Sequence, residues 1–129
     1  MREILFRGKR VDNGEWILGD LSQFPQHNVV AISEQEPYYS SCAVYGDSLG
    51  QFTGMTDKYG IYIFEGDILR LAPEYDDPGE ETFVTVEWID GAWCVRQTDR
   101  PNFPDLFVPD DAGKFEIVGN IHDNPEYIG

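Results

Sequence analysis

The sequence predicts a mostly β protein that forms one domain over residues 1–129. Three observations predict this class. The chain contains 13 Gly and 8 Pro, and they interrupt almost every window long enough for a helix. Runs of β-branched and aromatic residues alternate with turn sequences such as Asp90-Gly91. A hydrophobic content of 41% supplies enough apolar surface for a core without disulfides.

The first third of the chain is predicted to contain a hairpin and one further strand. Residues 3–22 place two apolar runs on either side of residues 12–14, whose types tolerate the positive φ of a tight turn. Residues 28–32 form a β-branched run that favours a strand. Residues 38–45 are consistent with either an extended segment or a short surface strand.

The middle of the chain contains two glycine-marked turns, at Gly60 and Gly66, on either side of a short apolar run. A strand is predicted to begin directly after the second turn and to cover residues 67–71. The prolines and like charges of residues 72–81 indicate an exposed loop.

The strongest local signal is a hairpin formed by residues 82–89 and 92–98 around Asp90-Gly91, since a type I′ turn needs positive φ at both central positions. Alternation along these strands predicts five core side chains: Val84, Val86, Trp88, Trp93 and Val95.

The last third is predicted to be irregular and then to end in a strand. Residues 99–114 contain three prolines, with one helical turn expected at residues 105–107. A strand follows at residues 115–121, where Val118 breaks the alternation and indicates burial on both faces. Short strands joined by tight turns favour a small SH3-like β-barrel over residues 54–129, with residues 1–53 as a β-rich N-terminal extension.

Six short segments, spread along nearly the whole chain, carry a family resemblance. They are Phe6-Arg7-Gly8-Lys9, Gly14-Glu15-Trp16, Gly50-Gln51-Phe52-Thr53-Gly54, Asp57-Lys58-Tyr59-Gly60, Ile63-Phe64-Glu65-Gly66-Asp67-Ile68, and residues 118–126. In these segments the chain resembles the YopX family of phage and prophage proteins. The resemblance implies a phage or prophage origin and the same SH3-like C-terminal half, and it implies no known activity.

The formal charge of −15 arises from 24 acidic and 9 basic residues. Such a charge repels phosphate backbones and favours a basic partner surface, and it also keeps a small protein soluble. The one basic cluster, at which nucleic acid would bind, consists of Arg2, Arg7, Lys9 and Arg10. Two isolated cysteines, with no apolar run of the roughly 20 residues that span a bilayer, predict a soluble cytoplasmic protein with reduced thiols. The family resemblance implies that this cytoplasm is that of the bacterial host.

Two polar clusters are candidates for acid–base chemistry. Glu65 and Asp67 flank Gly66, either as a carboxylate pair or as a turn in which Asp67 bonds nearby amides. If the last strand pairs with the strand that starts at Asp67, then Asn120 and His122 join them in a weak hydrolytic site with His122 as base. The sequence supplies neither a nucleophile nor an oxyanion stabiliser for it. Asp123 belongs to the same polar cluster, and the alternative role of Asn120 is to tie turns together through its side-chain amide.

Metal sites are not predicted. The four side chains with the right chemistry for zinc lack a close pair of ligands: His27, Cys42, Cys94 and His122. An acidic loop lacks the spacing and glycine of an EF-hand: Glu74, Asp76, Asp77, Glu80 and Glu81. No glycine-rich phosphate loop occurs. The sequence therefore predicts no catalytic, cofactor-binding or metal-binding residue, and no cofactor.

A non-enzymatic domain that binds a protein partner, or its own copies, agrees best with these observations. Four tyrosines are candidates for contact residues or for core residues: Tyr38, Tyr39, Tyr45 and Tyr75. A nucleic-acid-associated β-barrel that uses the N-terminal basic cluster and a weak hydrolase with the acidic and histidine groups are the two alternatives.

Overall fold

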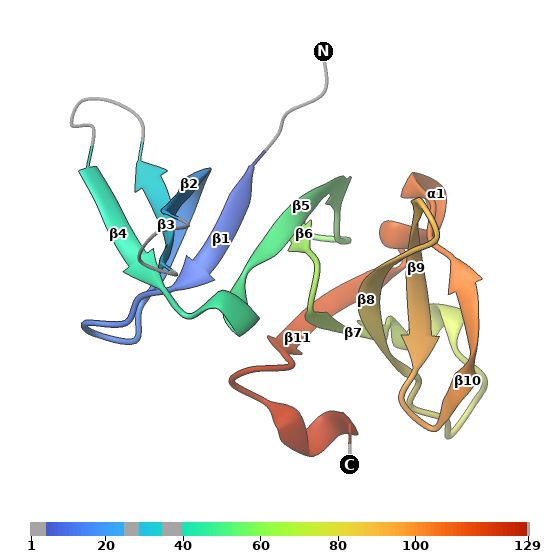
Figure 1. The fold of residues 1–129 in the computed structure, drawn as a ribbon. Helices are drawn as coiled ribbons and strands as arrows, with labels where there is room; N and C mark the ends of the chain where they lie inside the picture. Colours follow the sequence, from blue (N-terminus) through green and yellow to red (C-terminus); the bar gives the residue numbers. More distant parts are fainter. Residues whose placement is uncertain (1–4, 25–28, 35–39, 129) are drawn as a thin grey trace. The chain divides into compact units, whose positions relative to one another are not determined.

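The computed structural model describes residues 5–24, 29–34 and 40–128. The chain divides into two compact units, Met1–Phe52 and Thr53–Gly129. Strands dominate both units and form two antiparallel sheets (Figure 1), which confirms the predicted mostly β class. None of the helices among the described residues is long and apolar enough to cross a membrane.

The first unit is an antiparallel meander of four strands, and the chain then comes back to pair with the first of them. The order is β4-β3-β2-β1, and the first residues of β5 pair with β1. Phe6 lies opposite Gly19, which confirms the predicted N-terminal hairpin. Its strands are β1 (Phe6–Lys9), β2 (Trp16–Phe24), β3 (Val29–Glu34) and β4 (Ser40–Val44), followed by the 3₁₀ turn η2 (Gly46–Ser48). Strand β5 (Gly50–Thr56) begins in this unit and continues into the second.

A small apolar cluster holds this first unit together. Ile17 and Val44 are buried, and Phe6, Cys42 and Leu49 pack against them. Gly8 lies so close to Val44 that a Cβ at this position would come within 2.8 Å of the Val44 side chain. Glycine therefore allows β1 and Val44 to approach each other, and a larger residue would separate them.

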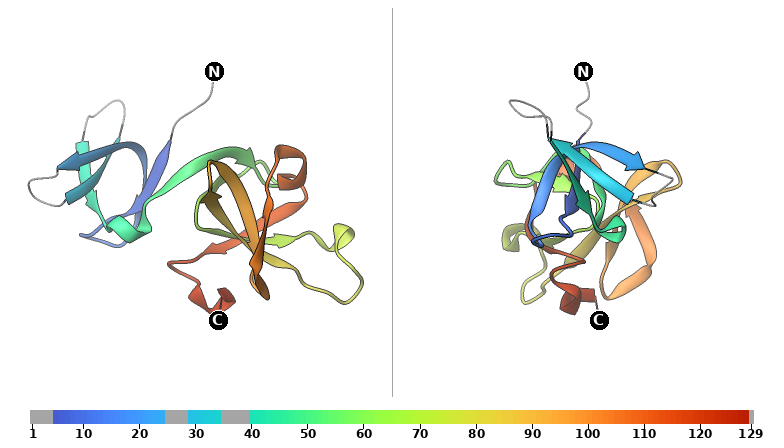
Figure 2. Two further views of the ribbon diagram at one scale, coloured as in Figure 1. Left: turned by 45° about the vertical axis from the view of Figure 1, so that its right-hand side comes forward. Right: turned by 60° about the vertical axis from the view of Figure 1, so that its left-hand side comes forward.

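The second unit contains a five-stranded sheet in the order β10-β9-β8-β7-β11 (Figures 1 and 2). Its edges are β10 and β11, and among the described residues the sheet does not close on itself; the SH3-like barrel stays a prediction. The elements are β6 (Tyr62–Phe64), which extends the first sheet beyond β5, β7 (Asp67–Leu71), β8 (Phe83–Ile89), β9 (Ala92–Gln97), β10 (Arg100–Leu106), α1 (Pro109–Ala112) and β11 (Phe115–Asn120), with 3₁₀ turns η3 (Pro73–Tyr75) and η4 (Pro125–Ile128).

The Asp90-Gly91 hairpin is confirmed. Both residues have positive φ, 50° and 82°, and Ile89 lies opposite Ala92, as a type I′ turn requires. Of the five predicted core side chains, Val84, Val86 and Trp93 are buried, and Val95 is half-buried against them.

The prediction that Trp88 belongs to the core is wrong. Its side chain is 49% exposed and meets the Trp93 ring edge-on at 4.9 Å between ring centroids. Alternation puts Trp88 on the same face as Val86. However, Trp88 lies three residues beyond Thr85, the last residue of β8 that pairs with β7, so β7 does not cover it. The core of this unit consists of Met55, Ile63, Leu69, Val84, Val86, Trp93, Phe107, Ala112 and Phe115.

The prediction of an irregular segment at residues 99–114 is also wrong, because β10 occupies its first half. Arg100 pairs with Gln97 and Leu106 with Cys94, with a register shift between them. An edge strand accommodates Pro101 and Pro104, since its outer side needs no amide donors. The helical turn expected at residues 105–107 lies instead at Pro109–Ala112.

The break in alternation at Val118 has a different cause from the one predicted. In the pairing of β11 with β7, Ile117 lies opposite Leu69 and Gly119 opposite Ile68, so Val118 is the extra residue of a bulge. Val118 is only half-buried. The expected burial on both faces is therefore wrong.

Candidate functional site

The Glu65-Gly66-Asp67 turn holds backbone groups in place. Asp67 is 1% exposed, and its Oδ2 accepts a hydrogen bond from the Phe64 amide at 2.8 Å. Gly66 has φ of 89°, and its amide donates to the Val86 carbonyl at 2.9 Å. The carboxylate of Asp67 is thus enclosed and bonded to the backbone, as in the turn interpretation of this segment.

The last strand does lie beside the one that starts at Asp67, with Asn120 opposite Asp67 in the register. The Asn120 Oδ1 accepts hydrogen bonds from the amides of His122 and Asp123, at 3.0 and 2.9 Å. Its Nδ2 donates to Asp123 Oδ2 at 3.2 Å. Asn120 therefore stabilises the turn that follows β11 through both polar atoms of its side-chain amide.

The zinc candidates do not gather. His27 lies outside the described residues, and Cys42 and Cys94 are free thiols. Across the described ranges, no three His, Cys, Asp or Glu side chains are placed to hold a metal ion. In the acidic loop, Asp76 accepts hydrogen bonds from the amides of Asp77 and Thr82 and from the Thr82 hydroxyl. This carboxylate orders the loop before β8.

The N-terminal basic residues have partners of their own. Arg10 donates two hydrogen bonds to the Asp12 carboxylate, at 2.9 and 2.7 Å. This bonding raises the pKa of Arg10 and lowers the pKa of Asp12. The Arg7 guanidinium lies over the Trp16 ring, 4.8 Å from its centroid. Arg2 lies outside the described residues.

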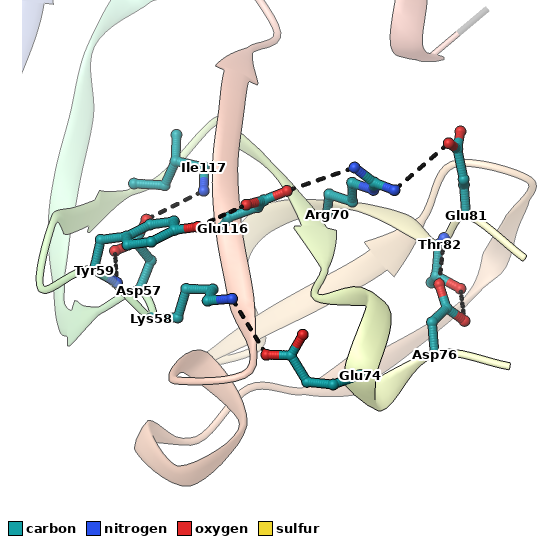
Figure 3. Close-up of polar contacts among 10 residues, drawn as sticks. All are labelled: Asp57, Lys58, Tyr59, Arg70, Glu74, Asp76, Glu81, Thr82, Glu116 and Ile117. Atoms are coloured by element: carbon teal, nitrogen blue, oxygen red, sulfur yellow. Dashed lines mark hydrogen bonds and ion pairs between the residues drawn. The ribbon is translucent and has the colours of Figure 1, made fainter. Parts of the chain in front are cut away.

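A polar network connects β7, β11, the β5–β6 turn and η3 within the second unit (Figure 3). Arg70 lies between Glu116 and Glu81, at 3.7 and 3.6 Å. Lys58 donates to Glu74 at 3.2 Å. This bond raises the pKa of Lys58, whereas the pKa of Glu74 is lowered first by its own backbone amide and then by Lys58.

Asp57 is the buried member of this network, at 4% exposure. Its Oδ1 accepts hydrogen bonds from the amides of Tyr59 and Ile61, at 2.8 and 3.0 Å. Its Oδ2 accepts one from the amide of Ile117, at 3.2 Å, and Figure 3 shows the bonds to Tyr59 and Ile117. One carboxylate thus closes the predicted turn at residues 57–60 and fastens it to β11. These polar groups hold the strands and turns of the second unit together.

An open pocket of about 460 Å³ lies in the second unit, at the end of β10. Its apolar walls continue the core, because Phe107 and Phe115 are core residues and Leu71 and Val95 pack against the core. The two phenylalanine rings meet edge-on, with centroids 6.0 Å apart. A volume of this size falls within the range of about 300–1,000 Å³ that is usual for ligand pockets.

The rim of this pocket combines exposed apolar and charged groups. Tyr75 on η3 and Leu106 at the end of β10 line it and are 54% and 69% exposed. Asp105, Asp111 and Lys114 also line it, with Lys114 Nζ 3.9 Å from Asp111 and 5.9 Å from the centroid of the Tyr75 ring. We call this site the Tyr75–Leu106 pocket.

Strand β10 and the residues after it carry further exposed apolar side chains. All seven of its residues are exposed, and Phe103 at 74% is the most exposed large apolar residue among those described. Val108, which directly follows Phe107, is 45% exposed. Exposed apolar residues at the rim of a concave site, such as Leu106 here, are typical of interaction surfaces.

Sequence reasoning found one residue of this site, Tyr75, and missed Leu106 and its neighbours. Tyr45, the other described tyrosine of the four candidates, is 49% exposed and lies in the first unit; Tyr38 and Tyr39 lie outside the described residues. The sequence contains one signal that could have indicated this site. Phe103 and Leu106 are large apolar residues in a segment otherwise rich in Pro and Asp, where few neighbouring residues could bury them.

The sequence profile of the YopX protein family matches residues 5–129 of this chain. No curated protein matches it. Among solved structures, it is similar to the crystal structure of protein EF1440 from Enterococcus faecalis, with 22% sequence identity and a TM-score of 0.63 over 100% of both chains. At this identity the likeness shows a shared fold.

Proposed function

The chain belongs to the YopX protein family over residues 5–129, and from this premise we propose that it is a non-enzymatic domain that binds a protein partner. We also propose a phage or prophage origin and a place in the cytoplasm of the bacterial host, in keeping with the sequence resemblance. The observation that carries the binding function is the Tyr75–Leu106 pocket, an opening onto the core with exposed apolar groups at its rim.

An SH3-like fold for the second unit is part of the proposal. Its support is the strand order β10-β9-β8-β7-β11: four consecutive strands form a meander, and the fifth returns beside the first. The short helix α1 lies between the fourth and fifth strands. Small β-barrels of this kind bind ligands on surfaces formed by strands and their loops.

Several groups that would serve other functions are already engaged. Asp67 is enclosed and bonded to the Phe64 amide, which removes the carboxylate that a hydrolase with His122 would use. Arg10 is paired with Asp12, which reduces the charge that the N-terminal cluster could offer to phosphates. The formal charge of −15 opposes close association of two copies, so a different protein is the preferred partner over self-association.

Site-specific photo-cross-linking tests the binding function in host cells. A photoreactive amino acid at position 106 should give cross-linked species of higher mass that are lost when Tyr75→Ala is introduced as well. The same group in place of Glu80, which is exposed in the acidic loop, is the matched control. Equal cross-linking from positions 106 and 80 contradicts the proposal, and a product of exactly twice the chain mass indicates self-association instead.

A further inference from the structure

We infer that the Tyr75–Leu106 pocket receives a large apolar side chain carried on a basic segment of the partner protein. This inference rests on the proposed protein-binding function and adds the chemistry of the partner. Its argument is charge complementarity, first of the whole second unit and then of the rim of the pocket.

The negative charge of the chain is concentrated in the second unit. Between Thr53 and Gly129 there are 17 acidic and 5 basic residues, whereas residues 1–52 contain 7 acidic and 4 basic residues. Four of the five basic side chains, those of Lys58, Arg70, Arg96 and Lys114, lie in ion pairs with carboxylates. The unit therefore presents a negative field to its surroundings and attracts a basic segment before contact.

The rim of the pocket shows the same imbalance on a local scale. Asp111 has Lys114 as a neighbour at 3.9 Å, whereas within the described ranges no hydrogen bond or ion pair engages the exposed carboxylates of Asp105 and Asp110. Asp105 lines the pocket, and Asp110 lies in the first turn of α1. Lysine or arginine residues beside the inserted side chain would pair with these carboxylates.

The exposed Tyr75 ring provides a second reason for a cationic partner. Lys114 Nζ lies 5.9 Å from its centroid, which is already the outer range of a cation–π contact. Because Tyr75 is 54% exposed, its ring has room for a further ammonium or guanidinium group from outside. A partner segment with both an apolar anchor and flanking cations would thus use the apolar walls, the carboxylates and the ring.

Three short synthetic peptides, added to the full chain, test this chemistry by fluorescence anisotropy. The first alternates Lys and Arg with Gly around a central Phe. The second has Ala in place of Phe, and the third has Glu in place of Lys and Arg. We expect the first to bind at least about tenfold more tightly than either of the others. Its affinity should fall as salt rises from about 50 to about 300 mM, because salt screens the attraction.

Two variants and one control test whether the first peptide binds at the Tyr75–Leu106 pocket. Leu106→Ser should weaken binding of the first peptide at every salt concentration, since it removes an apolar contact. Asp105→Asn should weaken binding mainly at low salt. Asp90→Asn, an equal loss of acidic charge at the β8–β9 turn, should have less effect, and Asn keeps the positive φ found there. Amide chemical shifts of Tyr75, Leu106 and Phe115 should change on binding.

The outcomes separate the inference from the function on which it rests. Preferential binding of the acidic peptide at the pocket overturns the basic partner and retains a protein-binding pocket. Equal binding of the Phe and Ala peptides, or equal weakening by Asp90→Asn, shows attraction to charge alone and also overturns the inference. Failure of all three peptides together with uniform cross-linking from positions 106 and 80 overturns both the inference and the proposed function.

Discussion

At the scale of single residues, the C-terminal turn depends on the absence of a side chain at position 119. A Cβ built on Gly119 would lie 2.3 Å from Asn124 Oδ1, the atom that accepts a hydrogen bond from the Asn120 amide. Asn124 also donates its own amide to the Asn120 carbonyl at 2.8 Å. The hydrogen bonds between Asn120 and Asn124 therefore depend on the space that Gly119 leaves for the Asn124 side chain.

Gly119→Ala should lower the free energy of unfolding by about 1–3 kcal/mol, the usual cost of forcing atoms into a filled site. Urea denaturation measures this change. Gly113→Ala is the matched control: its added Cβ meets nothing nearer than 4.0 Å, and its φ of −66° suits alanine, so stability should be unchanged or slightly higher. Equal losses from the two substitutions would refute the steric argument.

Asp57 fastens a turn to β11 with both carboxylate oxygens, so the loss of one acceptor should be measurable. Asp57→Asn keeps one carbonyl oxygen for Tyr59 and Ile61 but points an NH₂ group at the Ile117 amide, or the reverse. We expect a loss of about 1–3 kcal/mol from this buried unpaired donor.

Faster hydrogen exchange at the Ile117 amide, relative to the other amides of β11, would locate the effect of Asp57→Asn. Asp77→Asn serves as the control, because Asp77 is an exposed acidic-loop residue whose side chain contributes no hydrogen bond among the described contacts. A loss of similar size in Asp77→Asn would attribute the effect to charge instead of to the hydrogen bonds.

The Lys58–Glu74 pair predicts a pH effect of definite sign. The pKa of Glu74 is lowered by its own backbone amide and by Lys58, so its contribution to stability is present above the ordinary glutamate pKa. That contribution is lost as the pH falls through the lowered pKa. Both residues are exposed, and the pair therefore shifts titration more than stability.

Lys58→Met should raise the NMR titration midpoint of the Glu74 carboxyl only part of the way to its ordinary value, because the backbone amide remains. Arg96→Met, which removes a cation paired with Glu87, should leave this midpoint in place. An unchanged Glu74 midpoint in Lys58→Met would show that the backbone alone sets its pKa.

At the scale of elements, the sequence located strands wherever local signals agreed with the packing. The Asp90-Gly91 turn and the N-terminal hairpin depend on residues adjacent in the chain, and both were predicted correctly. Strand β10 depends instead on β9 beside it, which overrides the local effect of Pro101 and Pro104. The bulge at Val118 and the exposure of Trp88 likewise follow from where neighbouring strands end and shift register.

The pocket could not be predicted from the sequence, because it too depends on how distant segments pack together. Tyr75 and Leu106 lie 31 positions apart, on η3 and β10, and they line one site only because the intervening hairpin brings them together. Their residue types indicate surface contact, but no spacing rule relates them. By contrast, the enclosed Asp67 and the turn function of Asn120 could be inferred from turn chemistry alone.

Gly91→Ala should destabilise the β8–β9 hairpin by about 1–2 kcal/mol. The turn requires a φ of 82° at this position, where the Cβ of alanine is sterically strained. Asp90→Asn should be nearly neutral, since Asn adopts positive φ readily. Thermal unfolding of both variants provides the measurement, and near-ultraviolet circular dichroism of the Trp88–Trp93 contact reports on the hairpin itself. A neutral Gly91→Ala would indicate that the turn can change type without cost.

At the scale of the whole molecule, the nine core residues of the second unit all lie between Met55 and Phe115, and none comes from the first unit. A fragment of residues 50–129, which keeps β5 whole, should therefore unfold cooperatively in urea. Added salt should raise its stability, because 17 acidic residues repel one another in this unit.

A shorter fragment of residues 62–129 is the informative comparison with this fragment. It retains the five-stranded sheet but loses Met55 from the core and Asp57 from its bond to the Ile117 amide. We expect this fragment to show no cooperative transition, because a small domain has little stability to spare for a missing core residue and a missing buried anchor. Cooperative unfolding of residues 62–129 would show that the sheet alone suffices, and a non-cooperative 50–129 fragment would show that the second unit needs the first. The contrast between the two fragments thus measures how far residues 50–61 hold the second unit together.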